Sequence, residues 1–350
     1  MARALQLAAL GRCSTFPNPR VGAVVVSDGQ VVGEGWHRRA GEPHAEVFAL
    51  REAGERARGA DLYVTLEPCS HHGRTPPCAD AVIAAGLARV VVAMADPNPL
   101  VAGRGLDRLR AAGIAVDCGL MGTEARRLNR GFVSRMERGR PWVTLKLGAS
   151  LDGRTAMASG ESQWITSPEA RADVHRLRAE AGAVLTSSAT VLADDPQLSV
   201  RGIEASRQPD RIVLDGGARV PVDARVWAPG ARRLWISAMS PASWPDGVEA
   251  LQVPAANGRL DLAAALTALG SAAVNEVLVE CGPGLAGALL QARLVDELIV
   301  YLAPSLLGSE ARGLAALPGL AALDQRLRLR YTDLRQIGPD LRITAVPADH

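Results

Sequence analysis

Short β-rich runs alternate with amphipathic helical segments along this chain of 350 residues. Val21–Val26 and Val31–Trp36 flank an Asp28-Gly29 turn and predict a β-hairpin. His44–Arg58 then predicts a helix and Asp61–Leu66 a strand. Such alternation is typical of layered α/β folds. Because one core rarely serves more than about 250–300 residues, the length favours two domains.

The alternation divides into two series. A charged helix predicted over 123–137 runs into Arg138-Gly139-Arg140-Pro141, which we take as the boundary between domains 1–140 and 141–350. The other helices expected in the first domain are Leu5–Leu10, Cys78–Ala85 and Arg104–Ala112, and its other strands are Arg89–Ala95 and Ile114–Cys118. In the second domain we expect strands near Trp142–Leu147, Ala183–Ser187, Arg211–Leu214, Arg233–Ile236, Val274–Glu280, Glu297–Ala303 and Leu341–Ala345, and helices near Pro168–Ala181, Leu260–Leu269 and Leu285–Ala292.

Composition and charge exclude several classes of protein. A net charge of +2 gives no extended basic surface, so neither nucleic acid nor an anionic membrane is expected as a partner. No apolar run reaches the roughly 18 residues of a membrane span. The first residues are read as an amphipathic helix rather than a signal peptide. Five scattered cysteines make a disulfide framework improbable and fit a cytoplasmic chain with one metal site.

One histidine and two cysteines form the first chemical pattern. His44 opens a predicted helix, Cys69 follows a predicted strand, and Cys78 opens the next helix. Three such ligands leave a fourth zinc position open for water, as in catalytic sites. Glu46 could then carry protons between that water and a leaving amine. Two core cysteines beside a surface histidine, or a closed site completed by His71 or His72, are the alternatives.

Polar residues around this pattern suggest what it binds. His71 and Arg74 lie in the Ser70–Pro77 insert and would suit a phosphate-bearing substrate. Asn18 stands between two prolines and could read the edge of a base. As alternatives, Arg74 could be a solvated loop cation and Asn18 an ordinary turn residue.

A glycine-rich segment forms the second pattern. Gly282, Gly284 and Gly287 match G-x-G-x-x-G after the strand that ends at Glu280, and such glycines let a backbone approach a phosphate. The segment comes late in its domain and no acidic residue follows at about 20 residues, so an ordinary Rossmann site is disfavoured and a structural turn is the alternative. Lys146 is the only lysine among 39 basic residues, which favours a functional ammonium over a structural ion pair.

Taken together, these segments resemble one family over nearly the whole chain. PNPRVG, GEGWH, GEPHAEV, TLEPCSHHGRTPPC, DPNPLVAGRG, LKLGASLDGRTA, ESQWIT and TSSATVLADDP resemble the bifunctional deaminase/reductase family of riboflavin biosynthesis. The resemblance implies a cytidine-deaminase-like three-layer α/β/α domain followed by a dihydrofolate-reductase-like α/β domain. It also implies zinc-dependent hydrolytic deamination of 2,5-diamino-6-ribosylamino-4(3H)-pyrimidinone 5′-phosphate, then NADPH-dependent reduction of the ribosyl group to ribityl. Two departures are the C-x8-C spacing, where many zinc deaminases have C-x2-C, and a slightly shorter start.

The resemblance also implies roles for individual residues. In the deaminase, zinc would be held by His44, Cys69 and Cys78, with Glu46 as proton shuttle and substrate contacts from Asn18, His37, His71 and Arg74. NADPH would be lined by Gly148, Trp164, Thr190, Asp194, Gly282, Pro283, Gly284, Leu285, Ala286 and Gly287. The reductase substrate would contact Ser162, Arg178, Leu198, Arg201 and Glu280, with Arg178 and Arg201 suited to its 5′-phosphate. Independently of the resemblance, the position of Lys146 at the end of the strand predicted near Trp142–Leu147 suggests that it assists hydride transfer to the ribosyl C1′.

Alternatives remain for some of these residues and for the whole protein. Arg178 could belong to a solvated helix face, and Trp164 could pack in a core. A deaminase whose second domain only binds or dimerises would hold zinc without oxidising NADPH. A zinc-stabilised nucleic-acid module is disfavoured because aromatic residues make up only 3% of the chain. By analogy we expect a homo-oligomer, either a dimer or a tetramer.

Overall fold

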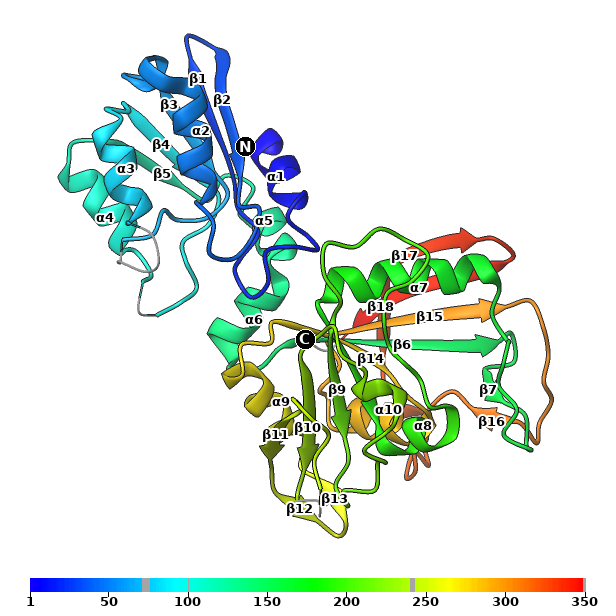
Figure 1. Ribbon diagram of the computed structural model, residues 1–350. Coiled ribbons are helices and arrows are strands. Elements are labelled where there is room, and N and C mark those ends of the chain that lie inside the picture. The colour runs from blue at the N-terminus through cyan, green and yellow to red at the C-terminus, as the bar shows by residue number, and fades with distance from the viewer. Residues whose placement is uncertain (71–75, 100, 240–242, 349–350) are drawn as a thin grey trace. The chain divides into compact units, whose positions relative to one another are not determined.

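The computed structural model describes residues 1–70, 76–99, 101–239 and 243–348. It divides into two compact units, Met1–Gly139 and Arg140–His350, each with its own sheet (Figure 1). None of the helices formed by these residues has the length and apolar character needed to cross a membrane.

The first unit is built on a five-stranded sheet with the order β2-β1-β3-β4-β5. Strand β1 pairs antiparallel with β2 and β3, and the remaining pairs are parallel. The strands are β1 Gly22–Ser27, β2 Gln30–Trp36, β3 Asp61–Val64, β4 Arg89–Val92 and β5 Ala115–Cys118. The helices are α1 Ala2–Ala9, α2 Ala45–Ala53, α3 Cys78–Ala84, α4 Arg104–Ala111, α5 Gly122–Leu128 and α6 Arg130–Arg138, with a 3-10 turn at Gly54–Ala57.

Glycines allow helix α2 to lie close against the hairpin of β1 and β2. A Cβ on Gly33 would lie 2.1 Å from the Ala49 carbonyl oxygen, and one on Gly35 would lie 2.3 Å from that of Ala45. Helix α1 packs on Val24, whereas Ala45 and Ala49 of α2 pack in the core formed with the neighbouring strand residues. The sheet therefore has helices on both faces, as predicted for a three-layer domain.

The predicted hairpin is confirmed, but the single helix predicted over 123–137 is wrong. It divides into α5 and α6 at Asn129, whose backbone leaves the helical region with φ −106° and ψ 22°. The Asn129 side chain accepts a hydrogen bond from the Arg20 N–H at 2.7 Å and donates to the Arg20 carbonyl at 2.9 Å. These bonds to a distant loop stabilise the break.

The second unit is built on a nine-stranded sheet with the order β11-β10-β9-β8-β14-β6-β15-β18-β17. Its strands are β6 Trp142–Ser150, β8 Ala183–Ser187, β9 Asp210–Leu214, β10 Arg233–Ser237, β11 Glu249–Gln252, β14 Glu276–Glu280, β15 Glu297–Ala303, β17 Leu329–Ile337 and β18 Asp340–Pro347. Strands β17 and β18 run antiparallel to their neighbours and the others are parallel. Small ribbons pair β7 Arg154–Ala156 with β16 Arg312–Gly313, and β12 Ala255–Ala256 with β13 Arg259–Leu260.

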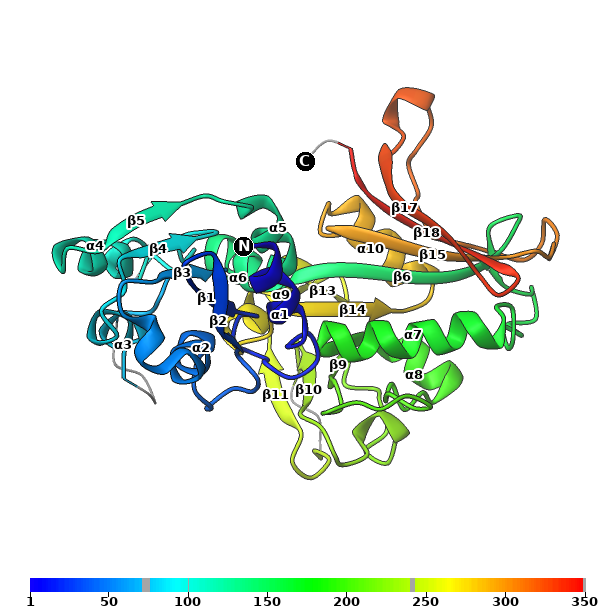
Figure 2. The ribbon, with the colours of Figure 1, turned by 90° about the horizontal axis from the view of Figure 1, so that it is seen from above.

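Two pairs of helices cover opposite faces of this sheet (Figure 2). Helices α9 Leu262–Ser271 and α10 Pro283–Gln291 pack on one core, while α7 Pro168–Ala181 and α8 Ser188–Asp194 pack on the other. Short 3-10 turns lie at Arg225–Trp227 and Leu323–Gln325. The α7 helix has its predicted bounds, because Ser167 caps it and Gly182 adopts φ 78° after it.

Candidate functional site

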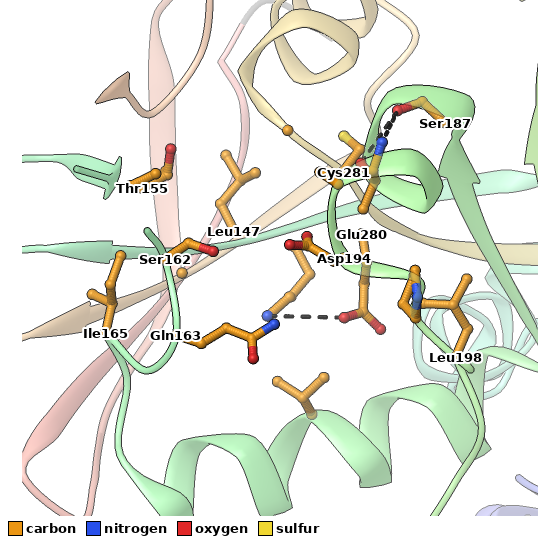
Figure 3. A pocket seen from close by; sticks show the side chains of 18 of the residues that line it. Leu147, Thr155, Ser162, Gln163, Ile165, Ser187, Asp194, Leu198, Glu280 and Cys281 are labelled. Carbon is orange, nitrogen blue, oxygen red and sulfur yellow. Dashed lines mark hydrogen bonds and ion pairs between the residues drawn. The ribbon is translucent and has the colours of Figure 1, made fainter. Parts of the chain in front are cut away.

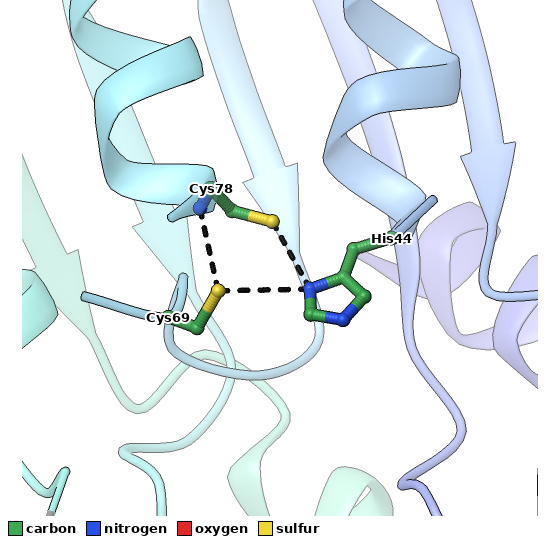
Figure 4. A group of neighbouring side chains, drawn as sticks. All are labelled: His44, Cys69 and Cys78. Carbon is green, nitrogen blue, oxygen red and sulfur yellow. Dashed lines mark hydrogen bonds between the residues drawn. The ribbon is translucent and has the colours of Figure 1, made fainter. Parts of the chain in front are cut away.

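Three metal-ligand side chains meet in the first unit (Figure 4). His44 is the N-cap of α2, Cys78 is the first residue of α3, and Cys69 lies in the loop after β3. The His44 Nδ1 lies 3.1 Å from Cys78 Sγ and 3.6 Å from Cys69 Sγ. The ligand atoms of all three side chains lie within 4.8 Å of one another.

This donor set fits zinc. Tetrahedral zinc has bonds of about 2.0 Å to nitrogen and 2.3 Å to sulfur, which separates the two donors by about 3.6 Å. Hydrogen bonding from Cys78 and then from His44 lowers the pKa of Cys69 to about 4, against the effect of burial. The hydrogen bond to Cys69, together with burial, raises the pKa of Cys78. Binding of a metal cation would displace the proton of Cys78, since the ligand form of cysteine is the thiolate.

Glu46 lies in the first turn of α2, two residues beyond His44, and is 3% exposed. Its Oε2 makes no hydrogen bond within the described part of the chain. Burial raises the pKa of this carboxyl group to about 7, with His44 acting in the opposite direction. A carboxyl group with this pKa can both accept and release a proton near neutral pH.

Asn18 and His37 extend the site on one side. The His37 Nδ1 lies 3.2 Å from the Pro43 carbonyl oxygen, so this nitrogen carries the proton and donates it. The His37 Nε2 then accepts a hydrogen bond from Asn18 Nδ2 at 3.1 Å. The His37 ring meets the His44 ring edge to face at 5.3 Å. Two other residues expected here, His71 and Arg74, lie outside the described residues.

The second unit contains a cavity of about 880 Å³ above the ends of its central strands (Figure 3). Its walls come from β6, the segment before α7, the inner face of α7, α8, the segment after α8 and the start of α10. The predicted residues that line it are Lys146, Gly148, Ser162, Trp164, Arg178, Thr190, Asp194, Leu198, Arg201, Glu280, Gly282, Pro283, Gly284 and Leu285. Trp164 is 69% exposed and stacks on Arg171 at 4.5 Å, so it does not pack in a core.

The glycine-rich segment needs a correction. We interpreted Gly282–Gly287 as one phosphate-binding loop, but helix α10 already begins at Pro283. Ala286 is fully buried, and a Cβ on Gly287 would lie 1.8 Å from the Ala316 carbonyl oxygen. Gly287 therefore serves close packing inside the unit, and neither it nor Ala286 lines the cavity.

An ionic cluster connects strands β6 and β14 with helix α7 at the cavity wall. Glu280 accepts two hydrogen bonds from Arg178, at 2.6 Å and 3.0 Å, and its Oε2 lies 4.0 Å from the Lys146 Nζ. Although burial alone would raise it, the pKa of Glu280 is lowered to about 2, chiefly by Arg178. Burial lowers the pKa of Lys146, which Glu280 partly opposes.

Comparison with known proteins identifies the family. The model of the RibD C-terminal domain matches residues 141–343, and that of the cytidine and deoxycytidylate deaminase zinc-binding region matches residues 1–94. The riboflavin biosynthesis protein RibD of Escherichia coli is 59% identical over 99% of this chain and 98% of its own length. This chain belongs to the RibD family. The family match confirms the predicted combination of a zinc-binding deaminase domain with a reductase domain.

Solved structures agree with this assignment. The RibD of Acinetobacter baumannii has a TM-score of 0.93 and 46% identity, covering 99% of this chain and 97% of that one. A diaminohydroxyphosphoribosylaminopyrimidine deaminase/5-amino-6-(5-phosphoribosylamino)uracil reductase from Thermotoga maritima has a TM-score of 0.89 and 34% identity, with the same coverage.

The structure also brings residues to the sites of this RibD-family chain that the sequence analysis did not single out. Buried Glu67, two residues before Cys69, accepts hydrogen bonds from the backbone N–H groups of Asp96, Gly103, Gly105 and Leu106. It thereby fixes a loop against the metal-ligand segment. Arg171, His175, Arg225 and Arg312 line the cavity of the second unit. The spacing of Arg171, His175 and Arg178 along one helical face could have signalled that group.

Proposed function

We propose that this chain deaminates 2,5-diamino-6-ribosylamino-4(3H)-pyrimidinone 5′-phosphate and then reduces the ribosyl group of the product with NADPH. Residues 1–140 would perform the first reaction and residues 141–350 the second. One observation supports the pairing most strongly. The chain contains a three-ligand cluster beside a buried carboxylate with one oxygen free of hydrogen bonds to the described residues in one unit, and a large cavity lined by a partly buried lysine in the other.

In the first reaction, His44, Cys69 and Cys78 would hold zinc, whose chemistry is to activate water at neutral pH. Glu46 would accept a proton as water adds to the ring carbon, and would return a proton to the amino group. The carbon–nitrogen bond then breaks, ammonia leaves, and a carbonyl remains. The free Oε2 and the raised pKa of Glu46 support this role.

Asn18 and His37 would orient the pyrimidine. Their mutual hydrogen bond fixes the Asn18 amide, so that its remaining donor and acceptor can face a base edge. His71 and Arg74 would contact the substrate from the insert between the two cysteines.

In the second reaction, NADPH would supply a hydride to C1′ and would lie against Gly148, Trp164, Thr190, Asp194 and the Gly282–Leu285 segment. Before the hydride arrives, the C1′–O4′ bond must break, an imine must form at C1′, and O4′ must take up a proton. Lys146 would donate that proton or stabilise the oxygen as charge develops on it. Its position in the cavity wall and its lowered pKa support a proton donor.

Product analysis with and without NADPH tests the proposal. With substrate alone, we expect ammonia and the deaminated ribosyl product. With NADPH added, we expect the ribityl product and one NADPH oxidised per molecule. Ammonia release without NADPH oxidation would instead favour a deaminase whose second unit only binds, and no ammonia release would refute the first reaction.

A further inference from the structure

Glu67 is buried two residues before the metal ligand Cys69, and it caps the start of helix α4. Gly103, the N-cap residue of α4, has no side chain that could satisfy the first N–H groups of the helix. The Glu67 carboxylate satisfies them instead. Its Oε1 accepts from the N–H groups of Gly105 and Leu106 at 2.8 Å and 3.4 Å, and its Oε2 from that of Gly103 at 3.0 Å. Because a helix N-terminus favours negative charge, this contact ties the segment before Cys69 to α4.

The two neighbours of Cys69 lie against the same helix. A Cβ on Gly105 would lie 2.1 Å from the Pro68 carbonyl oxygen, so a glycine is needed for α4 to come this close. On the other side of Cys69, the Arg108 Nη1 donates to the Ser70 carbonyl oxygen at 3.5 Å. The backbone before and after this ligand is therefore held by α4.

The position of the second cysteine depends on the first. The Cys78 N–H donates to Cys69 Sγ at 3.3 Å (Figure 4), and the Ala79 N–H donates to the Cys69 carbonyl oxygen at 3.1 Å. Arg108 also forms an ion pair of 2.5 Å with Asp80 in the first turn of α3. Eight residues separate the two cysteines, and closing a longer loop costs more conformational entropy. These contacts, which lead back to α4, therefore hold the two sulfurs together.

The third ligand has a different support. His44 is the N-cap of α2, which lies close against the β1–β2 hairpin at Gly33 and Gly35, and Glu46 follows in the first turn of the same helix. The site thus joins α2, which places His44 and Glu46, to α4, which places the two cysteines through Glu67. Zinc bonds to nitrogen and sulfur have narrow ranges of length, so a small shift between these two supports weakens metal binding.

We propose that Glu67 is a positioning residue for the deamination, which sets the distance between the two cysteines and His44 by binding the start of α4. Through that distance it sets the affinity of the site for zinc and the alignment of Glu46 with the metal. The inference rests on the proposed first reaction. Metal affinity can nevertheless be measured without the pyrimidine substrate, so the role of Glu67 and the reaction itself can fail separately.

The test is Glu67→Gln, which keeps the side-chain volume but leaves one terminal atom that cannot accept hydrogen bonds from the four N–H groups now bound. We expect the dissociation constant for Zn²⁺, measured by competition with a chelator, to rise about 10- to 100-fold. In the Co²⁺-loaded protein the visible absorption bands should shift, since they report the geometry around the metal. At saturating zinc, kcat for ammonia release should still be lower by at least about 10-fold, because Glu46 is displaced from the metal. Reduction of the deaminated substrate should be unchanged.

Glu52→Gln is a matched control. Its carboxylate also accepts a backbone N–H in the first unit, from Glu34 at 2.9 Å, and its loss should leave zinc affinity within about 2-fold. If Glu67→Gln yields no folded protein, Arg108→Gln provides a milder test, because that side chain lies at the surface. It should raise the zinc dissociation constant about 2- to 5-fold, and an unchanged constant would then overturn the proposal.

A folded Glu67→Gln protein with wild-type zinc affinity, Co²⁺ spectrum and kcat, and with only its stability lowered, would show a purely structural role and overturn the proposal. A wild-type protein that binds one zinc but releases no ammonia would refute the first reaction. The comparison of zinc affinities would still test whether Glu67 positions the ligands.

Discussion

Two substitutions of Lys146 distinguish a catalytic role of its ammonium group from a structural role. Its Nζ lies 4.0 Å from Glu280 Oε2 and 5.9 Å from the centroid of the Tyr301 ring, and the side chain is 18% exposed. Lys146→Ala removes both the charge and the aliphatic stem. Lys146→Arg keeps the charge but replaces a compact ammonium with a planar guanidinium.

The structure sets the expected size of the stability change. Removing one partner of a buried ion pair costs about 3–5 kcal/mol when the other charge is left alone. Glu280 is not left alone in Lys146→Ala, because Arg178 still donates two hydrogen bonds to it. We therefore expect the free energy of unfolding to fall by only about 1 kcal/mol, which corresponds to a Tm shift of roughly 2–4 °C.

The reductase rate should respond far more strongly. A proton donor or charge that acts on the developing alkoxide contributes about 10²- to 10³-fold to kcat. We expect kcat for NADPH oxidation to fall by that factor in Lys146→Ala, with NADPH affinity and ammonia release unchanged. Lys146→Arg should recover little of the loss. Near-normal kcat in Lys146→Arg, together with a large loss of stability in Lys146→Ala, would refute the reasoning.

Local patterns explain why much of the first unit could be predicted. Asp28 and Gly29 both adopt positive φ, at 49° and 76°, and these two residue types are the ones that such a turn favours. The hairpin turn could therefore be predicted from two residues. The ligand group could also be predicted, because His44 and Cys78 lie at helix starts and Cys69 lies in the loop after a strand, and the neighbouring residues determine these elements.

Elements that depend on distant contacts could not be predicted in the same way. The break at Asn129 needs Arg20, which is 109 positions away. Strand β17 was missed because most of its residues are exposed on both faces, and the alternation of apolar and polar residues that starts at Leu329 is not kept beyond Thr332. Helix α8 begins with a cap from Ser187 inside a segment rich in serine and threonine, which gives little helical signal.

Contacts between residues far apart in the sequence also limited what could be predicted of the second site. Arg178 and Arg201 looked equivalent as phosphate ligands, because sequence shows the charge of a side chain and not its partner. Glu280 lies 102 positions from Arg178 in the sequence. Its side chain accepts hydrogen bonds from Arg178 and not from Arg201. Likewise, the glycine pattern at 282–287 did not reveal that a helix starts at Pro283.

Three further changes test the two sites. Glu46→Gln keeps the side-chain volume but removes the proton carrier, so ammonia release should fall at least about 10²-fold while zinc content and reduction of the deaminated substrate persist. Cys69→Ser should lose zinc and ammonia release together, as metal analysis and an ammonia assay on the same preparation would show. The pKa of Glu280 is lowered from 4.5 to about 2. A carboxylate whose pKa is lower in the folded state stabilises the fold above its unfolded pKa, and this contribution disappears as the pH falls from about 4.5 towards 2. Glu280→Gln leaves Arg178 without its partner, so stability at pH 7 should decrease, but the further loss of stability below pH 4.5 should become smaller than in the wild type. Denaturant unfolding at several pH values measures both, and equal acid sensitivity in the two proteins would show that the ion pair does not carry this pH dependence.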